Sequence, residues 1–80
     1  MLNKNFCGII EKRAQSYRNR TLKNVDEEAL SAIYDHLCTL CCHAFGYEVV
    51  PFLNDILNDS YNSTIILKHV KKIKEEFESL

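Results

Sequence analysis

One short segment, residues 38–43, gathers residue types that often carry chemistry. It reads Cys-Thr-Leu-Cys-Cys-His, with three thiols and one imidazole in a row of six. A Cys-x-x-Cys spacing is typical of zinc sites, redox pairs and haem attachment. Haem attachment needs a histidine directly after the second cysteine, where this chain has Cys42. Redox pairs lie at a helix N-terminus after a strand, and structural zinc sites have a second ligand pair. This segment has a helix-interior pattern and no second pair, so none of the three chemistries is favoured.

A metal site would need ligands from other helices. Cys38 and Cys42 are four residues apart on one helical face, and Cys7 and His69 could complete a set of four ligands. The simpler interpretation is that Cys38 and Cys41 are small buried hydrophobic residues, as free cysteines usually are. We therefore expect no metal and no cofactor.

The other acids, bases and nucleophiles do not form a catalytic arrangement. His36 and His43 are seven residues apart, whereas two metal ligands on a helix favour a spacing of four, so solvated histidines are expected. The acids at 26–28 fit a helix N-terminus, and those at 75–78 fit a solvated helix face with nearby lysines. The sequence has no glycine-rich phosphate loop, and a chain this short leaves little room for a pocket. We predict that the protein is not an enzyme.

Basic residues are concentrated in the first quarter of the chain. Residues 1–25 have a net charge of +5, whereas residues 26–80 have −6. On a helix, positions 13, 16, 20 and 23 would form one basic stripe. The residues of this region that we expect to bind a partner are Arg13, Tyr17, Arg18, Arg20 and Lys23.

Two explanations of this asymmetry stay open. The cations could match acidic residues of packed neighbouring helices, or they could bind an anionic partner, either an acidic protein surface or nucleic acid. A pI of about 6.3 and the acidic segment that follows the basic one both argue against nucleic acid. A protein partner is therefore the first expectation and nucleic acid the alternative.

Hydrophobic spacing predicts an all-α fold. The apolar residues recur at intervals of three and four over about residues 4–22, 26–45, 51–58 and 63–79, which indicates a bundle of three to four helices. The second segment has two adjacent apolar stripes, so it is expected to be the central helix. Two glycines and one proline supply few sharp turns, which argues against a β-sandwich or barrel.

Local signals predict where these helices begin and end. Asn24 followed by Glu27 resembles a capping box, and Gly46 is a candidate for the residue just after the second helix. Pro51 fits the first position of the third helix, and Asn62 or Ser63 fits the N-cap of the last.

The last helix has the cleanest amphipathic pattern. Its apolar residues follow spacings of 4, 3, 4 and 3 and are Ile66, Val70, Ile73, Phe77 and Leu80. Such a seam could pair with a second copy of the chain or complete the core of a single copy. The first alternative predicts a homodimer.

Size and composition set the class of protein. Eighty residues with 46% hydrophobic content support a single helical domain over residues 1–80. The apolar run at residues 6–10 is too short for a signal peptide, and no segment has the apolar length of a membrane span. We expect a cytoplasmic protein with reduced thiols and no membrane partner.

Together these observations predict a non-catalytic interaction module. It would act as a small regulatory or inhibitory accessory protein that occupies a protein partner's surface, with the basic residues of the first helix as the specificity face. The alternative is a nucleic-acid-binding regulator that uses the same residues.

Overall fold

The computed structural model describes residues 4–43, 46–59 and 61–79, and these residues form helices with no strand. The helices are α1 (Lys4–Arg18), α2 (Val25–Cys42), α3 (Val49–Leu57) and α4 (Thr64–Glu78), with a 3-10 helix at Gly46–Glu48 before α3. The predicted all-α fold is confirmed.

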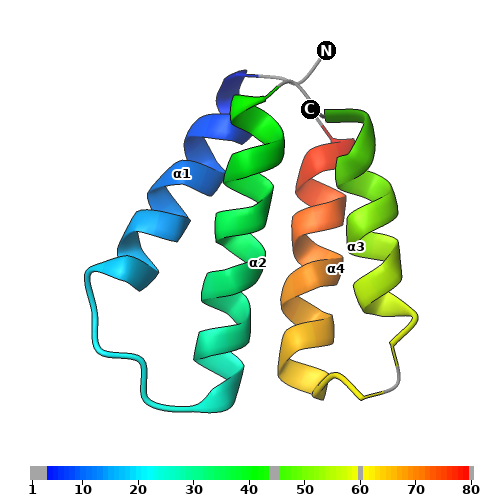
Figure 1. The fold of residues 1–80 in the computed structure, drawn as a ribbon. Helices are drawn as coiled ribbons and strands as arrows, with labels where there is room; N and C mark the ends of the chain where they lie inside the picture. The colour runs from blue at the N-terminus through cyan, green and yellow to red at the C-terminus, as the bar shows by residue number, and fades with distance from the viewer. Residues whose placement is uncertain (1–3, 44–45, 60, 80) are drawn as a thin grey trace.

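The helices form two antiparallel pairs that lie side by side (Figure 1). α1 packs mainly against α2, and α3 packs mainly against α4. A smaller contact between α2 and α4 joins the two pairs, so the order across the bundle is α1, α2, α4, α3. Because neither α1–α4 nor α2–α3 is closely packed, a seam lies on each side of the α2–α4 contact.

One hydrophobic core holds the pairs together, and all four helices contribute to it. The edge of Phe6 meets the ring of Phe77 with centroids 5.0 Å apart, which ties the start of α1 to the end of α4. The buried residues are Phe6, Ile10, Ala14, Leu30, Ile33, Tyr34, Leu37, Leu40, Val49, Leu53, Ile66, Val70 and Ile73.

Helix α1 ends at Arg18, four residues before the predicted end, and a connection that ends at the N-cap Asn24 leads to α2. Asn24 is extended, with φ −155° and ψ 172°, and its side chain accepts a hydrogen bond from the Glu27 amide at 2.9 Å. The Glu27 carboxylate in turn accepts from the Lys23 amide at 2.8 Å. The predicted cap at Asn24 is confirmed, but the return bond of Glu27 goes to the amide of Lys23, the residue before the cap, and not to the amide of Asn24 as in a capping box.

The start of α1 at Lys4 agrees with the prediction, and the boundaries of the other three helices differ from it by one to three residues. α2 ends at Cys42 rather than 45, since the chain reverses direction before α3, and residues 44–45 lie outside the described residues. Gly46 begins the 3-10 helix instead of following α2 directly. Pro51 is the third residue of α3, still in the first turn, where backbone N–H groups have no partner within the helix.

Ser63 caps α4 and also links the two helix pairs. Its hydroxyl oxygen accepts from the Ile66 amide at 3.2 Å and donates to Asp26 at the start of α2 at 2.9 Å. The predicted cap at Ser63 is confirmed, and Asn62 instead donates its side-chain amide to the Ile56 carbonyl at 3.0 Å.

Replacing this hydroxyl tests the link. We expect Ser63→Ala to lower the free energy of unfolding by about 1–2 kcal/mol, since it removes both the cap and the bond to Asp26. Urea denaturation followed by circular dichroism at 222 nm measures the change. Ser79→Ala is the control, because the Ser79 hydroxyl donates to Glu76 within its own helix and a change within about 0.5 kcal/mol is expected. Equal effects of the two substitutions would contradict the assignment.

Candidate functional site

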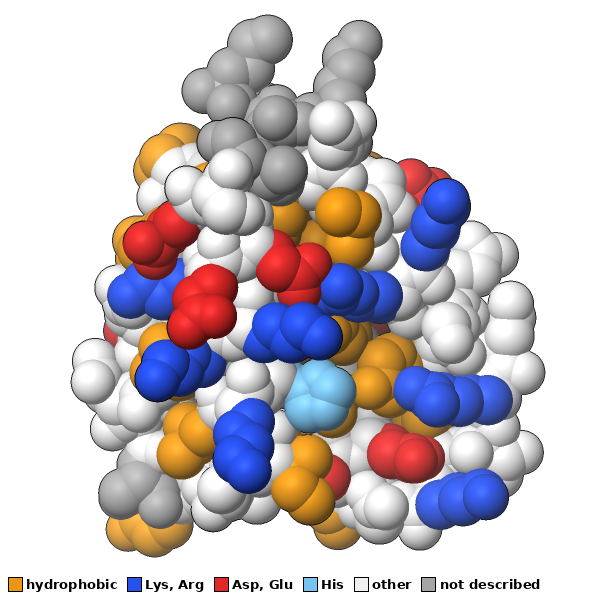
Figure 2. Space-filling view, turned by 180° about the vertical axis from the view of Figure 1, so that it is seen from behind, with side chains coloured by type: hydrophobic (Ala, Val, Ile, Leu, Met, Phe, Trp, Pro, Cys, Tyr) orange, Lys and Arg blue, Asp and Glu red, His pale blue; other side chains and the backbone are white. Residues whose placement is uncertain are grey.

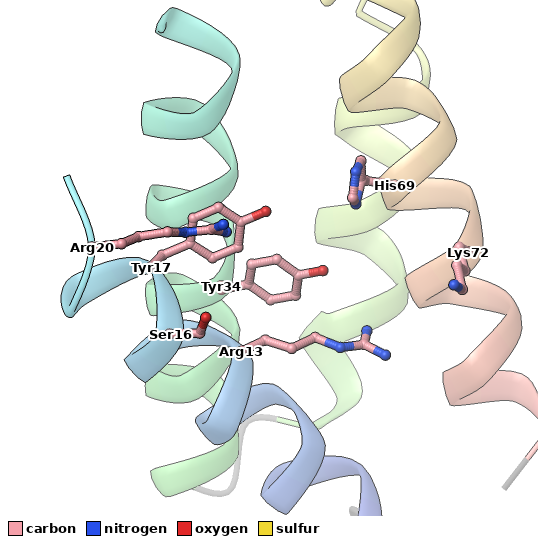
Figure 3. Close-up of a pocket in the computed structure, with 7 residues that line it drawn as sticks. All are labelled: Arg13, Ser16, Tyr17, Arg20, Tyr34, His69 and Lys72. Atoms are coloured by element: carbon pink, nitrogen blue, oxygen red, sulfur yellow. The ribbon is translucent and has the colours of Figure 1, made fainter. Parts of the chain in front are cut away.

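The predicted basic residues do not all lie together. Seen from behind (Figure 2), the molecule shows Lys and Arg side chains spread over one face, with a histidine and hydrophobic atoms exposed between them. A half-open pocket of about 260 Å³ opens between α1, α2 and α4. We call it the basic–aromatic pocket, and its lining residues are Arg13, Ser16, Tyr17, Arg20, Tyr34, His69 and Lys72 (Figure 3).

Stacked aromatic rings form one wall of the basic–aromatic pocket. The Tyr17 and Tyr34 rings are nearly parallel, with centroids 5.5 Å apart. The Arg20 guanidinium carbon lies 4.0 Å from the centre of the Tyr17 ring, a cation–π contact. This contact holds Arg20 at the pocket even though the residue follows the end of α1.

Arg13 joins this wall to α4. Its guanidinium donates to the Glu76 carboxylate at 2.9 Å, and both side chains are partly shielded from water. Burial disfavours the charged guanidinium, but the hydrogen bond to Glu76 and the charges of Tyr34 and Glu76 outweigh it, so the pKa of Arg13 is raised. The second Glu76 oxygen, Oε1, is buried without a hydrogen-bond partner among the described residues.

The pocket presents donors toward its opening. Burial raises the pKa of Tyr34, and the nearby Arg13 only partly opposes this, so the phenol stays protonated at neutral pH. Figure 3 shows the tyrosine hydroxyls and the Arg13 guanidinium directed from the α1–α2 side toward α4, where His69 and Lys72 lie. The arrangement suits a negatively charged group, because a charged or hydroxyl donor stands on each side.

Two cations of the pocket are not neutralised locally. Among the described residues the ion pairs within 4.0 Å are Arg13–Glu76, Arg18–Asp35 and Lys74–Glu78. Arg20 and Lys72 belong to none of them. Their charges therefore act outward, and the low-dielectric walls of a pocket strengthen such a field.

Arg18 and Lys23, predicted to belong with the other basic residues, lie elsewhere. The Arg18 guanidinium binds the Asp35 carboxylate on α2 at 2.6 Å and does not line the basic–aromatic pocket. Lys23 is exposed in the connection between α1 and α2 and does not line the pocket. The internal-match explanation of the charge asymmetry holds for Arg13 and Arg18, whereas Arg20 belongs to no ion pair among the described residues. The anionic-partner explanation stays a prediction.

Sequence reasoning missed Tyr34, His69 and Lys72 as members of the site. Tyr34 looked like an ordinary core residue, and its stacking on Tyr17 depends on how two helices cross. His69 and Lys72 are three residues apart and share a face of α4, which was the one local signal available.

The cysteines line a second pocket, of about 230 Å³ between α1 and α2, which we call the thiol pocket. Its lining residues are Cys7, Glu11, Arg18, Cys38, Cys41 and Cys42. The structure brings together three of the four alternative metal ligands, but His69 lies in the basic–aromatic pocket instead. Among the described residues no group of three His, Cys, Asp or Glu side chains could hold a metal ion, so the proposed ligand set does not form.

Burial raises the pKa values of two of the four cysteine thiols. It raises the pKa of Cys38, and the nearby Arg18 opposes the shift only in part. Burial together with a hydrogen bond to Cys7 raises the pKa of Cys41 to about 12. Cys42, by contrast, is exposed.

The apolar seam of α4 lies inside the chain. Ile66, Val70 and Ile73 are at most 5% exposed, and Phe77 packs against the same core. Leu80 lies outside the described residues. The seam completes the core, the second of the two alternatives, so these three side chains are not available to another copy.

Comparisons with other proteins add no relative. No protein-family model matches the chain, and the searches of curated proteins and of solved structures find no match. In the described part of the chain, no helix is both long enough and apolar enough to span a bilayer.

Alkylation tests the thiol pocket. A thiol with a pKa near 12 is about one part in ten thousand thiolate at pH 8, so native Cys41 should react with iodoacetamide far more slowly than Cys42. Peptide mapping by mass spectrometry after timed labelling gives both rates. In urea the two rates should converge, which serves as the control. Equal rates in the native protein would contradict the burial of Cys41.

Proposed function

We propose that the protein is a non-catalytic interaction module that binds an acidic group of a protein partner in the basic–aromatic pocket. The supporting observation is that Arg20 and Lys72, both without an ion-pair partner among the described residues, stand on opposite sides of one pocket with His69 and two tyrosines. A carboxylate placed between them would gain charge-assisted hydrogen bonds.

The pocket favours binding over catalysis. No Asp or Glu lines it, and Glu76, which contacts the lining residue Arg13, is held in an ion pair with that guanidinium. The polar lining groups are cations, hydroxyls and an imidazole whose charge and donors suit recognition. We propose a regulatory or inhibitory role and a cytoplasmic location, which would keep the four cysteines as the thiols they are in the structure.

A protein partner fits the pocket better than nucleic acid does. Single-stranded nucleic acid is bound by bases that stack on exposed aromatic rings. The Tyr17 ring already stacks on Tyr34 and carries Arg20 over it, so it is not open to a base. The pocket also has two cations that form no ion pair among the described residues, fewer than the row of cations that usually follows a phosphate backbone.

The oligomeric state is a separate question. The predicted homodimer cannot use the buried residues of the α4 seam, but large exposed hydrophobic side chains exist elsewhere, at Val25, Tyr61 and Ile65. Light-scattering mass of the reduced protein on a sizing column decides between monomer and dimer.

A charge-reversal pair tests the pocket. Arg20→Glu with Lys72→Glu should weaken binding of a short Glu-rich peptide by at least about a hundredfold, because two charge-assisted bonds of about 1.5–3 kcal/mol each are lost and about 1.4 kcal/mol corresponds to a tenfold change in affinity. Isothermal calorimetry at about 0.15 M salt measures affinity, and amide chemical shifts locate the peptide.

A matched control separates the site from general charge effects. Lys12→Glu with Lys71→Glu makes the same change in net charge, with exposed residues of α1 and α4 that do not line the pocket. This control should weaken binding of the Glu-rich peptide by less than about threefold. Equal losses of affinity in the two double variants would refute binding of the peptide in the basic–aromatic pocket. Tighter binding of duplex DNA than of the peptide, with a steep salt dependence, would favour the nucleic-acid alternative.

A further inference from the structure

The charges are separated more sharply than a division into chain quarters shows. Residues 24–67, which include all of α2 and α3, contain no Lys or Arg and seven Asp or Glu. Every Lys and Arg lies in α1, in the connection that follows it, or in α4. The basic–aromatic pocket lies on the α1–α4 seam, so the opposite α2–α3 seam should have the opposite character.

A groove occupies that second seam. It has a volume of about 580 Å³ and lies between α2 and α3, and we call it the α2–α3 groove. Apolar side chains from both helices line it, among them Ala32, Ile33, Phe52 and Ile56. The groove exists because α2 and α3 each pack on another helix and because the alanines of α2 do not fill the space between them.

The groove and the basic–aromatic pocket lie on different sides of α2. Tyr34 lines the pocket, whereas Ala32 and His36 line the groove, and residues two apart on a helix point about 160° apart. In Figure 3, α3 is seen behind the labelled side chains, between α2 and α4. A ligand in one site therefore does not fill the other.

The apolar surface continues beyond the groove. Val25 is 77% exposed and precedes Ala29, Ala32 and His36 of the groove at spacings of four, seven and eleven residues along α2. These positions follow one helical face. At its C-terminal end the His36 ring packs on the Phe52 ring of α3, with the two centroids 4.4 Å apart. The result is an apolar strip along most of α2, a shape that matches a helix laid lengthwise.

The rim of the groove carries two carboxylates at the C-terminal end of α3, where negative charge is unfavourable for the stability of the helix. Asp55 lies in the last turn of α3 and Asp59 just after it, and the last turn has no basic residue. The C-terminal end of a helix carries partial negative charge, so carboxylates there repel it and cations are favoured. One Asp59 oxygen accepts from the Tyr61 amide at 2.9 Å, which leaves the groove side with uncompensated negative charge.

We propose that the α2–α3 groove docks a cationic amphipathic helix of a partner protein. Apolar side chains of that helix would enter the groove against Ala32, Phe52 and Ile56, and flanking Lys or Arg would lie against Asp55 and Asp59. Charge complementarity selects this occupant, because the lining has carboxylates and no Lys or Arg. The proposal concerns a surface separate from the basic–aromatic pocket and stands without the function proposed above.

Three model peptides test both parts of the recognition. The first has Leu on one helical face and Lys on the rest, the second has Glu in place of Lys, and the third has Ser in place of Leu. The Leu–Lys peptide should bind at about 0.15 M salt, with amide shifts confined to α2, α3 and residues 58–62. The other two should bind at least about tenfold more weakly, since each lacks one of the two complementary features.

Substitutions in the protein locate the site. Asp55→Lys with Asp59→Lys should weaken binding of the Leu–Lys peptide at least about tenfold and should strengthen binding of the Leu–Glu peptide. Ala32→Tyr, at an exposed position, should block the groove without a change in charge. Glu11→Lys with Glu75→Lys is the charge-matched control, at exposed positions of α1 and α4. The Leu–Lys peptide should still bind this variant more tightly than the other two peptides do. Circular dichroism confirms that each variant is folded.

Several results would overturn the proposal. Equal weakening by the control pair, or shifts that map to α1 and α4, would show diffuse attraction instead of docking. Equal binding of the Leu–Lys and Leu–Glu peptides would remove the role of the acidic rim. A concentration-dependent dimer that Asp55→Lys with Asp59→Lys dissolves would place a second copy of the chain in the groove in place of the cationic helix.

Discussion

The contact between α2 and α4 is the constraint on which the rest of the structure depends. It joins two helix pairs that are each more closely packed internally than they are with one another. A chain of this length buries a limited share of its surface, so it closes this one joint and leaves a seam on either side of it. Both candidate binding surfaces are consequences of that geometry. They are the places where helices face each other without enough side-chain volume to fill the space between them.

The side chains that bridge the seams give the two sides different characters. On the α1–α4 side, the Arg13–Glu76 ion pair spans the gap and the buried Oε1 of Glu76 is left without a partner. Such a pair contributes modestly to stability, because desolvation offsets much of its attraction. Its clearer effect is positional, since it holds α1 and α4 at the distance that lets Arg20 and Lys72 face one another. On the α2–α3 side, short alanines leave an open apolar strip instead.

The sequence predicted the helices far better than the site. Apolar spacing and the caps at Asn24 and Ser63 are local properties, so they could be read directly, whereas apolar spacing extended α1 four residues beyond its end at Arg18. The site combines Tyr17 and Arg20 with Lys72, some fifty residues away, and only the packing of α1 beside α4 brings them together. The α4 seam shows the same limit. Amphipathic spacing predicts that Ile66, Val70 and Ile73 are covered, but it does not say whether the same chain or a second copy covers them.

A net charge of −1 gives a misleading picture of how this molecule presents itself to partners. Screening at physiological salt acts over about 8 Å. The fold measures 34 × 29 × 19 Å, so each of its dimensions exceeds this length and solvent-exposed charges on opposite faces are largely screened from one another. A partner that approaches either seam meets the local sign of charge rather than the average. Two surfaces of opposite sign on one small scaffold are therefore independent in their electrostatics, although the single helix α2 lines both of them.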